Sequence, residues 1–102
     1  SYVDEAKKNA DEITVQNLKS ALVVVCGELE VEGANLPGLP IRFRYTKDLA
    51  LLDGAYSILR EKIFEIVGED MPELSTEGSY LMVEIFVDEN GRLKADVTME
   101  LE

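Results

Sequence analysis

Hydrophobic residues recur every three or four positions between Thr46 and Gly68, and this spacing predicts an amphipathic helix. The apolar stripe consists of Leu52, Ala55, Tyr56, Leu59, Ile63, Ile66 and Val67. Thr46 or Asp48 would cap the first turn, and Gly68 would end the helix in the left-handed conformation. We therefore expect a central helix over about residues 47–67, with a β-hairpin on either side.

A second helical pattern occupies residues 1–19. Its stripe is Val3, Ala6, Ala10 and Ile13, with charged residues on the opposite face. Because alanine buries little apolar area, we expect this helix to be loosely attached or to need a partner.

From Ser20 the apolar residues alternate with polar ones, which is typical of a half-buried strand. One face carries Val23, Val25, Leu29 and Val31, and the other carries Glu28, Glu30 and Glu32. After a turn at residues 33–38, alternation resumes at residues 40–46. The matching antiparallel register pairs Glu30 with Arg42, Glu28 with Arg44, Leu29 with Phe43 and Val31 with Ile41. We expect a first hairpin in which the two arginines are neutralised by these glutamates.

Residues 79–87 and 92–101 predict a second hairpin around the turn Asp88-Glu89-Asn90-Gly91. A three-residue loop with Gly91 left-handed pairs apolar residues with each other, whereas a two-residue loop would set Val87 against Lys94. We expect the three-residue loop, whose register pairs Val87 with Leu93, Ile85 with Ala95, Val83 with Val97 and Leu81 with Met99.

These elements predict a single α+β domain spanning residues 1–102, in the order α-β-β-α-β-β. The two hairpins would form a four-stranded, mainly antiparallel sheet with the central helix packed on one face. The last two residues, 101–102, are of a kind that a purification tag leaves behind.

The charge is strongly unbalanced, with 21 acidic against 10 basic residues and a formal net charge of −11. This charge disfavours direct binding to nucleic acid or to an anionic membrane, and it favours a partner protein with a basic surface. Solubility alone explains it equally well. Cys26 is the single cysteine, which excludes an internal disulfide and favours a reducing, cytoplasmic setting. The longest apolar run, residues 21–26, is too short to span a bilayer.

The residue types that carry most enzyme chemistry are missing. The chain has no histidine, no glycine-rich phosphate loop followed by lysine, and only one cysteine for a zinc site. The run Asp88-Glu89-Asn90-Gly91 lacks the later glutamate that would complete a calcium loop. We therefore expect no catalytic residue, no metal and no cofactor, and interpret Glu69, Asp70 and Glu73 as a solvated acidic loop.

One distribution of residues favours a binding surface. Between Lys62 and Arg92 there are eight acidic residues and no basic one, and the second hairpin turns two aromatic side chains and a methionine away from the core. An acidic surface with apolar anchors is suited to a basic partner. The candidate partner-binding residues are Phe64, Glu69, Asp70, Glu73, Tyr80, Met82, Glu84 and Phe86.

The sequence thus predicts a small acidic, non-enzymatic protein-interaction domain, such as an adaptor, an inhibitor or an immunity-type binder of a basic protein. One alternative is a small-ligand pocket between the central helix and the sheet, lined by Phe43, Tyr45 and Tyr56. Another is a homodimer that covers Tyr80, Met82 and Phe86, unless the N-terminal helix itself covers them.

Overall fold

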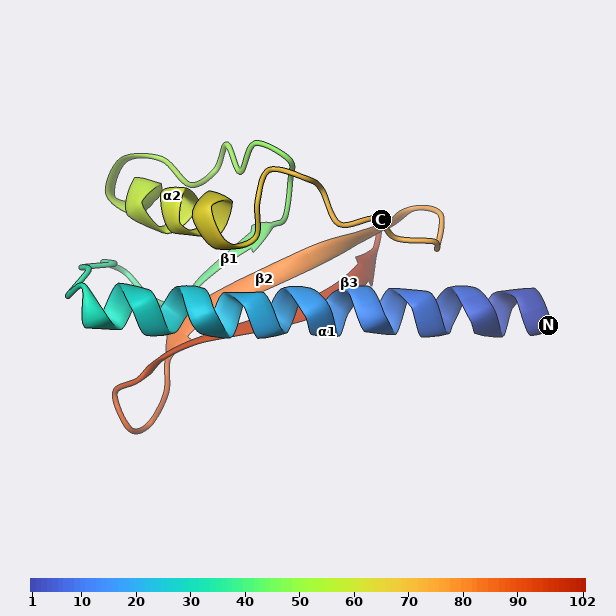
Figure 1. Cartoon of the computed structure of the whole chain (residues 1–102), viewed down its shortest axis with the longest axis horizontal. Coiled ribbons are helices and arrows are strands. Elements are labelled where there is room, and N and C mark those ends of the chain that lie inside the picture. Colours follow the sequence, from blue (N-terminus) through green and yellow to red (C-terminus); the bar gives the residue numbers. More distant parts are fainter.

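The computed structural model describes residues 1–102 and contains two α-helices and a three-stranded antiparallel sheet (Figure 1). Strand β2 lies between β1 and β3 in the sheet. The α+β class is as expected, but the four-stranded sheet and the α-β-β-α-β-β order are wrong. The elements in chain order are α1 (Tyr2–Val31), β1 (Ile41–Arg44), a 3₁₀ turn η1 (Gly54–Tyr56), α2 (Ser57–Ile66), β2 (Ser79–Val87) and β3 (Leu93–Leu101).

Helix α1 continues through the segment that alternation had assigned to a strand, so the expected first strand does not exist. The apolar residues of segment 20–32 fit both the two-residue spacing of a strand and the three- to four-residue spacing of a helix. The helix buries more of their side chains. The residues of α1 that are buried include Leu18, Leu22, Val25, Cys26 and Leu29, which are spaced by one to four positions along one helical face. Burial of this face outweighs the strand preference of the valines. None of the helices is long and apolar enough to cross a membrane.

Strand β1 consequently pairs with β2, with Arg42 opposite Glu84 and Phe43 opposite Val83. The expected pairing of Arg42 and Arg44 with the glutamates of residues 28–32 is wrong. Those arginines instead reach acidic residues of the C-terminal segment. The ion pairs are Arg42 with Glu100 and Arg44 with Glu102.

The central helix is shorter than expected, because α2 begins at Ser57 rather than near residue 47. Asp48 does not cap a helix; its carboxylate accepts the N–H of Ala50 at 3.2 Å within an irregular loop. Leu49, with φ of 49°, and Leu52 fold back from this loop into the core. The end is close to expectation, since the helix stops at Ile66 and Gly68 has φ of 92°.

The second hairpin has the expected register. Val87 lies opposite Leu93, and Val83 lies opposite Val97. The backbone carbonyl of Asp88 accepts the N–H of Gly91 at 3.0 Å, and Gly91 has φ of 77°, as a three-residue loop requires.

Both helices pack on one face of the sheet and share one core with it. In the middle of β2 and β3 the odd-numbered residues are buried in this core and the even-numbered residues point away, as expected, whereas Val87 and Leu101 at the strand ends are exposed. The buried hydrophobic residues are Leu18, Leu22, Val25, Cys26, Leu29, Phe43, Tyr45, Leu49, Leu52, Leu59, Ile63, Leu81, Val83, Ile85, Ala95 and Val97. Because α1 lies on the inner face, it does not cover Tyr80, Met82 and Phe86, and its expected role as their cover is wrong.

Asp11 attaches the middle of α1 to the loop before β2. Its carboxylate, 1% exposed, accepts the N–H of Ser75 at 2.6 Å and the N–H of Thr76 at 3.0 Å. The hydroxyl of Thr76 donates a third hydrogen bond. Burial acts to raise the pKa of Asp11, but the three hydrogen bonds outweigh it and lower the pKa below 3.8.

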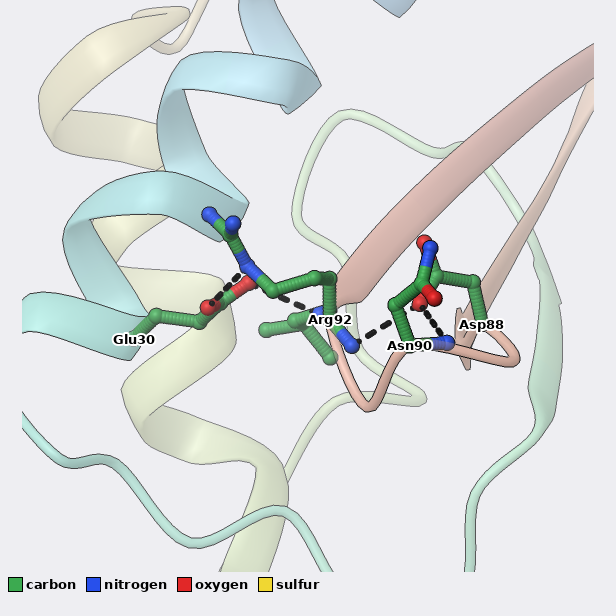
Figure 2. Close-up of polar contacts among 5 residues, drawn as sticks. Glu30, Asp88, Asn90 and Arg92 are labelled. Atoms are coloured by element: carbon green, nitrogen blue, oxygen red, sulfur yellow. Dashed lines mark hydrogen bonds and ion pairs between the residues drawn. The ribbon is translucent and has the colours of Figure 1, made fainter.

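Glu30 attaches the end of α1 to the second hairpin (Figure 2). Its carboxylate accepts the N–H of Leu93 at 2.7 Å and the Nε–H of Arg92 at 2.9 Å. These two donors lower the pKa of Glu30. On the other side of the turn, the carboxylate of Asp88 accepts the N–H groups of Asn90 and Arg92, both at 2.9 Å. The start of β3 is thereby fixed against α1.

Lys62 joins α2 to the end of α1. Its ammonium group lies 2.6 Å from Glu32, 3.3 Å from Glu28 and 3.4 Å from Glu65. The hydrogen bond to Glu32 is the main reason that the pKa of this lysine is raised. Glu28 and Glu32, which were expected on a strand, thus hold the two helices together.

We predict that Asp11→Ala lowers the free energy of unfolding by about 2 kcal/mol, because it removes the buried carboxylate that accepts the N–H groups of Ser75 and Thr76. Urea denaturation measures this value. Glu12→Ala, at the neighbouring exposed position, is the matched control and should change stability by less than about 0.5 kcal/mol. Equal effects of the two substitutions would contradict the role of Asp11.

The stabilisation from Asp11 should also depend on pH in a defined direction. Since folding lowers the pKa of this carboxyl below 3.8, its contribution is complete well above pH 3.8 and is lost as the pH falls through the lower, folded value. The stability difference between the wild type and Asp11→Ala should therefore be constant near neutral pH and shrink below about pH 4. A difference that grows on acidification would contradict the lowered pKa.

Candidate interaction surfaces

The N-terminal third of α1 stands clear of the rest of the molecule (Figure 1). Residues 1–10 are all exposed, and Asp11 is the first buried residue. The helix begins with a capping box, in which Ser1 and Asp4 satisfy each other's backbone N–H groups. About 15 Å of helix therefore projects without tertiary support.

One face of α1 remains exposed along its whole length, and it is mostly apolar, with Asn17 and Ser20 as its polar members. We define the α1 stripe as the exposed residues Val3, Ala6, Ala10, Ile13, Asn17, Ser20, Val24, Gly27 and Val31. Its larger side chains are well exposed, at 60% for Val3, 61% for Ile13, 50% for Val24 and 89% for Val31. The stripe lies away from the buried face of α1, so the core leaves it free.

Sequence reasoning found only the first half of this stripe, Val3 to Ile13. The signal for the second half was present, because spacings of three and four residues alternate without a break from Val3 to Val31. It was missed because residues 20–32 were assigned to a strand.

The second surface is the outer face of the sheet, where Tyr80, Met82, Glu84 and Phe86 lie half-buried on β2. This position was expected for all four residues. The guanidinium group of Arg44 lies 4.2 Å from the centre of the Tyr80 ring and partly covers it.

Basic residues interrupt the negative charge of this outer face. The register sets Arg42 beside Glu84 and Lys94 beside Phe86, and Lys19 lies 3.2 Å from Asp96. The absence of bases between Lys62 and Arg92 in the sequence therefore does not make this face uniformly acidic.

The remaining candidate residues lie elsewhere. Phe64 packs against the core and, with Glu69, lines one surface hollow. Asp70 and Glu73 line another hollow, of about 410 Å³, between α1 and the end of α2. The eight candidate residues thus occupy separate places: Phe64 packs on the core side, whereas Tyr80, Met82 and Phe86 face away from it.

The expected ligand pocket has no counterpart among the five main hollows, because none of them is lined by Phe43, Tyr45 or Tyr56. Phe43 and Tyr45 are buried in the core. The hydroxyl of Tyr56 donates to the carbonyl of Pro37.

Groups with chemical reactivity do not converge at either surface. No cluster of three or more acidic or cysteine side chains has an arrangement that would hold a metal ion. Cys26 is 2% exposed, and its burial raises the pKa of the thiol to about 11, with a smaller contribution from Glu30. Comparison of the chain with protein-family models, with curated proteins and with solved structures finds no match.

We predict that the thiol of Cys26 is inert in the folded protein. With a pKa of about 11, only about one molecule in a thousand carries the thiolate at pH 8, and the core shields it from reagents. A thiol-reactive dye at pH 8 should label the native protein slowly and the urea-unfolded protein at once. Rapid labelling of the native state would contradict this packing.

Proposed function

We propose that this protein is a non-enzymatic protein-interaction domain that binds a helical partner through the α1 stripe. The observation that carries the proposal is the exposure of Val3, Ile13, Val24 and Val31 on one face of a helix that extends beyond its own domain. Such an arrangement buries nothing within the monomer, and an amphipathic partner helix is the usual complement of an apolar helical face.

The anchoring of α1 supports the same proposal. Asp11 and Glu30 fix the helix to the loop before β2 and to the hairpin, so the part of the stripe from Ile13 to Val24 lies between two anchored points. A preformed surface loses little conformational entropy on binding, which favours recognition over an area of modest size.

A basic partner at the acidic loop is the second candidate. The loop residues Glu69, Asp70 and Glu73 adjoin Met71, which is 38% exposed beside the hollow at the end of α2. Exposed acidic groups around a methionine suit a cationic protein, whose binding would weaken as salt is raised.

Substitutions at adjacent exposed positions of α1 test the main proposal. Val24→Lys places a charge on the stripe, whereas Val23→Lys makes the same change beside it, at a residue that is 59% exposed. Proteins retained from an extract of the source cells by the immobilised wild type, copies of this chain included, should also be retained by Val23→Lys and lost by Val24→Lys.

Glu69→Lys/Glu73→Lys serves as the comparison for the acidic loop. Loss of the partner with this double variant alone, together with full retention by Val24→Lys, would replace the main proposal by the second candidate. Circular dichroism and urea denaturation of each variant verify that the fold is retained.

A further inference from the structure

The α1 stripe follows the heptad spacing of helices that pair along their length. From Val3 to Val31 its members alternate in steps of three and four residues, and all nine are exposed. When the spacing between stripe residues averages 3.5 positions, the stripe keeps facing one partner helix over several turns. The stripe therefore suits a long, continuous helix as its occupant rather than a loop or a strand.

We infer that this occupant is the α1 helix of a second copy of the chain, packed antiparallel. The inference rests on the proposed function and adds the identity of the partner. One register pairs eight of the nine stripe residues, each pair occurring twice by symmetry, whereas Val3 extends past the end of the facing helix. It places Ile13 against Val24 of the partner subunit, Ala10 against Gly27 of the partner subunit, Ala6 against Val31 of the partner subunit, and Asn17 against Ser20 of the partner subunit.

The sizes and polarities in this register are complementary. Ala10 with the facing glycine lets the two backbones approach closely, whereas Ile13 with the facing valine fills the wider space beside them. Asn17 and the facing serine lie at the centre, where a polar pair satisfies itself and penalises other alignments.

Charge favours the antiparallel orientation. Lys7 forms no ion pair within the monomer, and this register brings it beside Glu28 of the partner subunit. A parallel pair would instead crowd the acidic ends of both helices, including Glu28, Glu30 and Glu32, against their own copies.

The contact area limits how tight this dimer is. A strip about 40 Å long and about 10 Å wide on each helix buries in total about 800–1,000 Å², at the low end of specific interfaces. The net charge of −11 on each copy adds long-range repulsion. The dimer should therefore form in the micromolar range or above and tighten as salt screens the repulsion.

Sedimentation equilibrium of the purified protein tests the pairing. The wild type should show a reversible monomer–dimer equilibrium that tightens between about 20 mM and about 200 mM salt. Val24→Lys should weaken the dimer about tenfold or more, and Val23→Lys should change it little, since lysine is tolerated beside such a stripe. A wild type that remains monomeric at several hundred micromolar would overturn the inference.

Disulfide cross-linking tests the orientation. Ile13→Cys and Val24→Cys proteins, mixed in equal amounts under mild oxidation, should form a mixed disulfide dimer. Each alone should form little, because the register holds the two copies of residue 13 about 16 Å apart, beyond the reach of a disulfide. The wild type, with its single buried Cys26, is the control. Efficient dimerisation of Ile13→Cys alone would indicate a parallel pair and overturn the antiparallel register.

The capture experiment and these measurements together distinguish failure of the self-pairing from failure of the proposed function. If the purified chain stays monomeric while a different protein is captured and lost with Val24→Lys, the self-pairing is wrong and the proposed function stands. If the chain stays monomeric and nothing is captured through the stripe, both are wrong.

Discussion

Hydrogen bonds from backbone N–H groups to two acidic side chains of α1 determine how the long helix lies on the sheet. Asp11 accepts from Ser75 and Thr76, and Glu30 accepts from Leu93. The hydrophobic effect is non-directional, whereas hydrogen bonds at two distant points add directional constraints on the position and rotation of the helix. The face that α1 turns toward solvent is therefore set by the same contacts that fix its buried face.

The two carboxylates also organise segments that lack regular structure. Residues 69–78 connect α2 to β2 without a helix or strand of their own, and their backbone polar groups need partners. Asp11 supplies an acceptor to two of these groups, and the hydroxyl of Thr14 donates to the carbonyl of Glu73 at 3.3 Å. Helix α1 thus provides the hydrogen-bonding partners that hold this loop in place.

Prediction from the sequence was most successful where a hydrophobic pattern was compatible with only one structure. The register of β2 and β3 was predicted correctly, because Gly91 and the alternation of Leu81, Val83 and Ile85 allow a single register. Residues 20–32 admitted both a strand and a helix, and only contacts with distant residues decide between them. The partners of Glu28, Glu30 and Glu32 proved to be Lys62 and Arg92, which local spacing cannot indicate.

The candidate surfaces were predictable to a similar extent. The outward orientation of Tyr80, Met82 and Phe86 followed from parity alone. The electrostatic character of their surroundings did not, because β1 brings Arg42 and Arg44 to β2 from a distant part of the sequence. A charge run in one strand describes a surface only when the neighbouring strands are known.

The projecting turns of α1 have a thermodynamic consequence. A helical segment of about ten residues without tertiary neighbours is only marginally stable in water, and the capping box at Ser1 offsets this only in part. In the proposed pairing, a partner helix that contacts the anchored turns near Ile13 would also stabilise the projecting turns that precede them. The measured affinity of such a pairing would then include the free energy needed to order these turns.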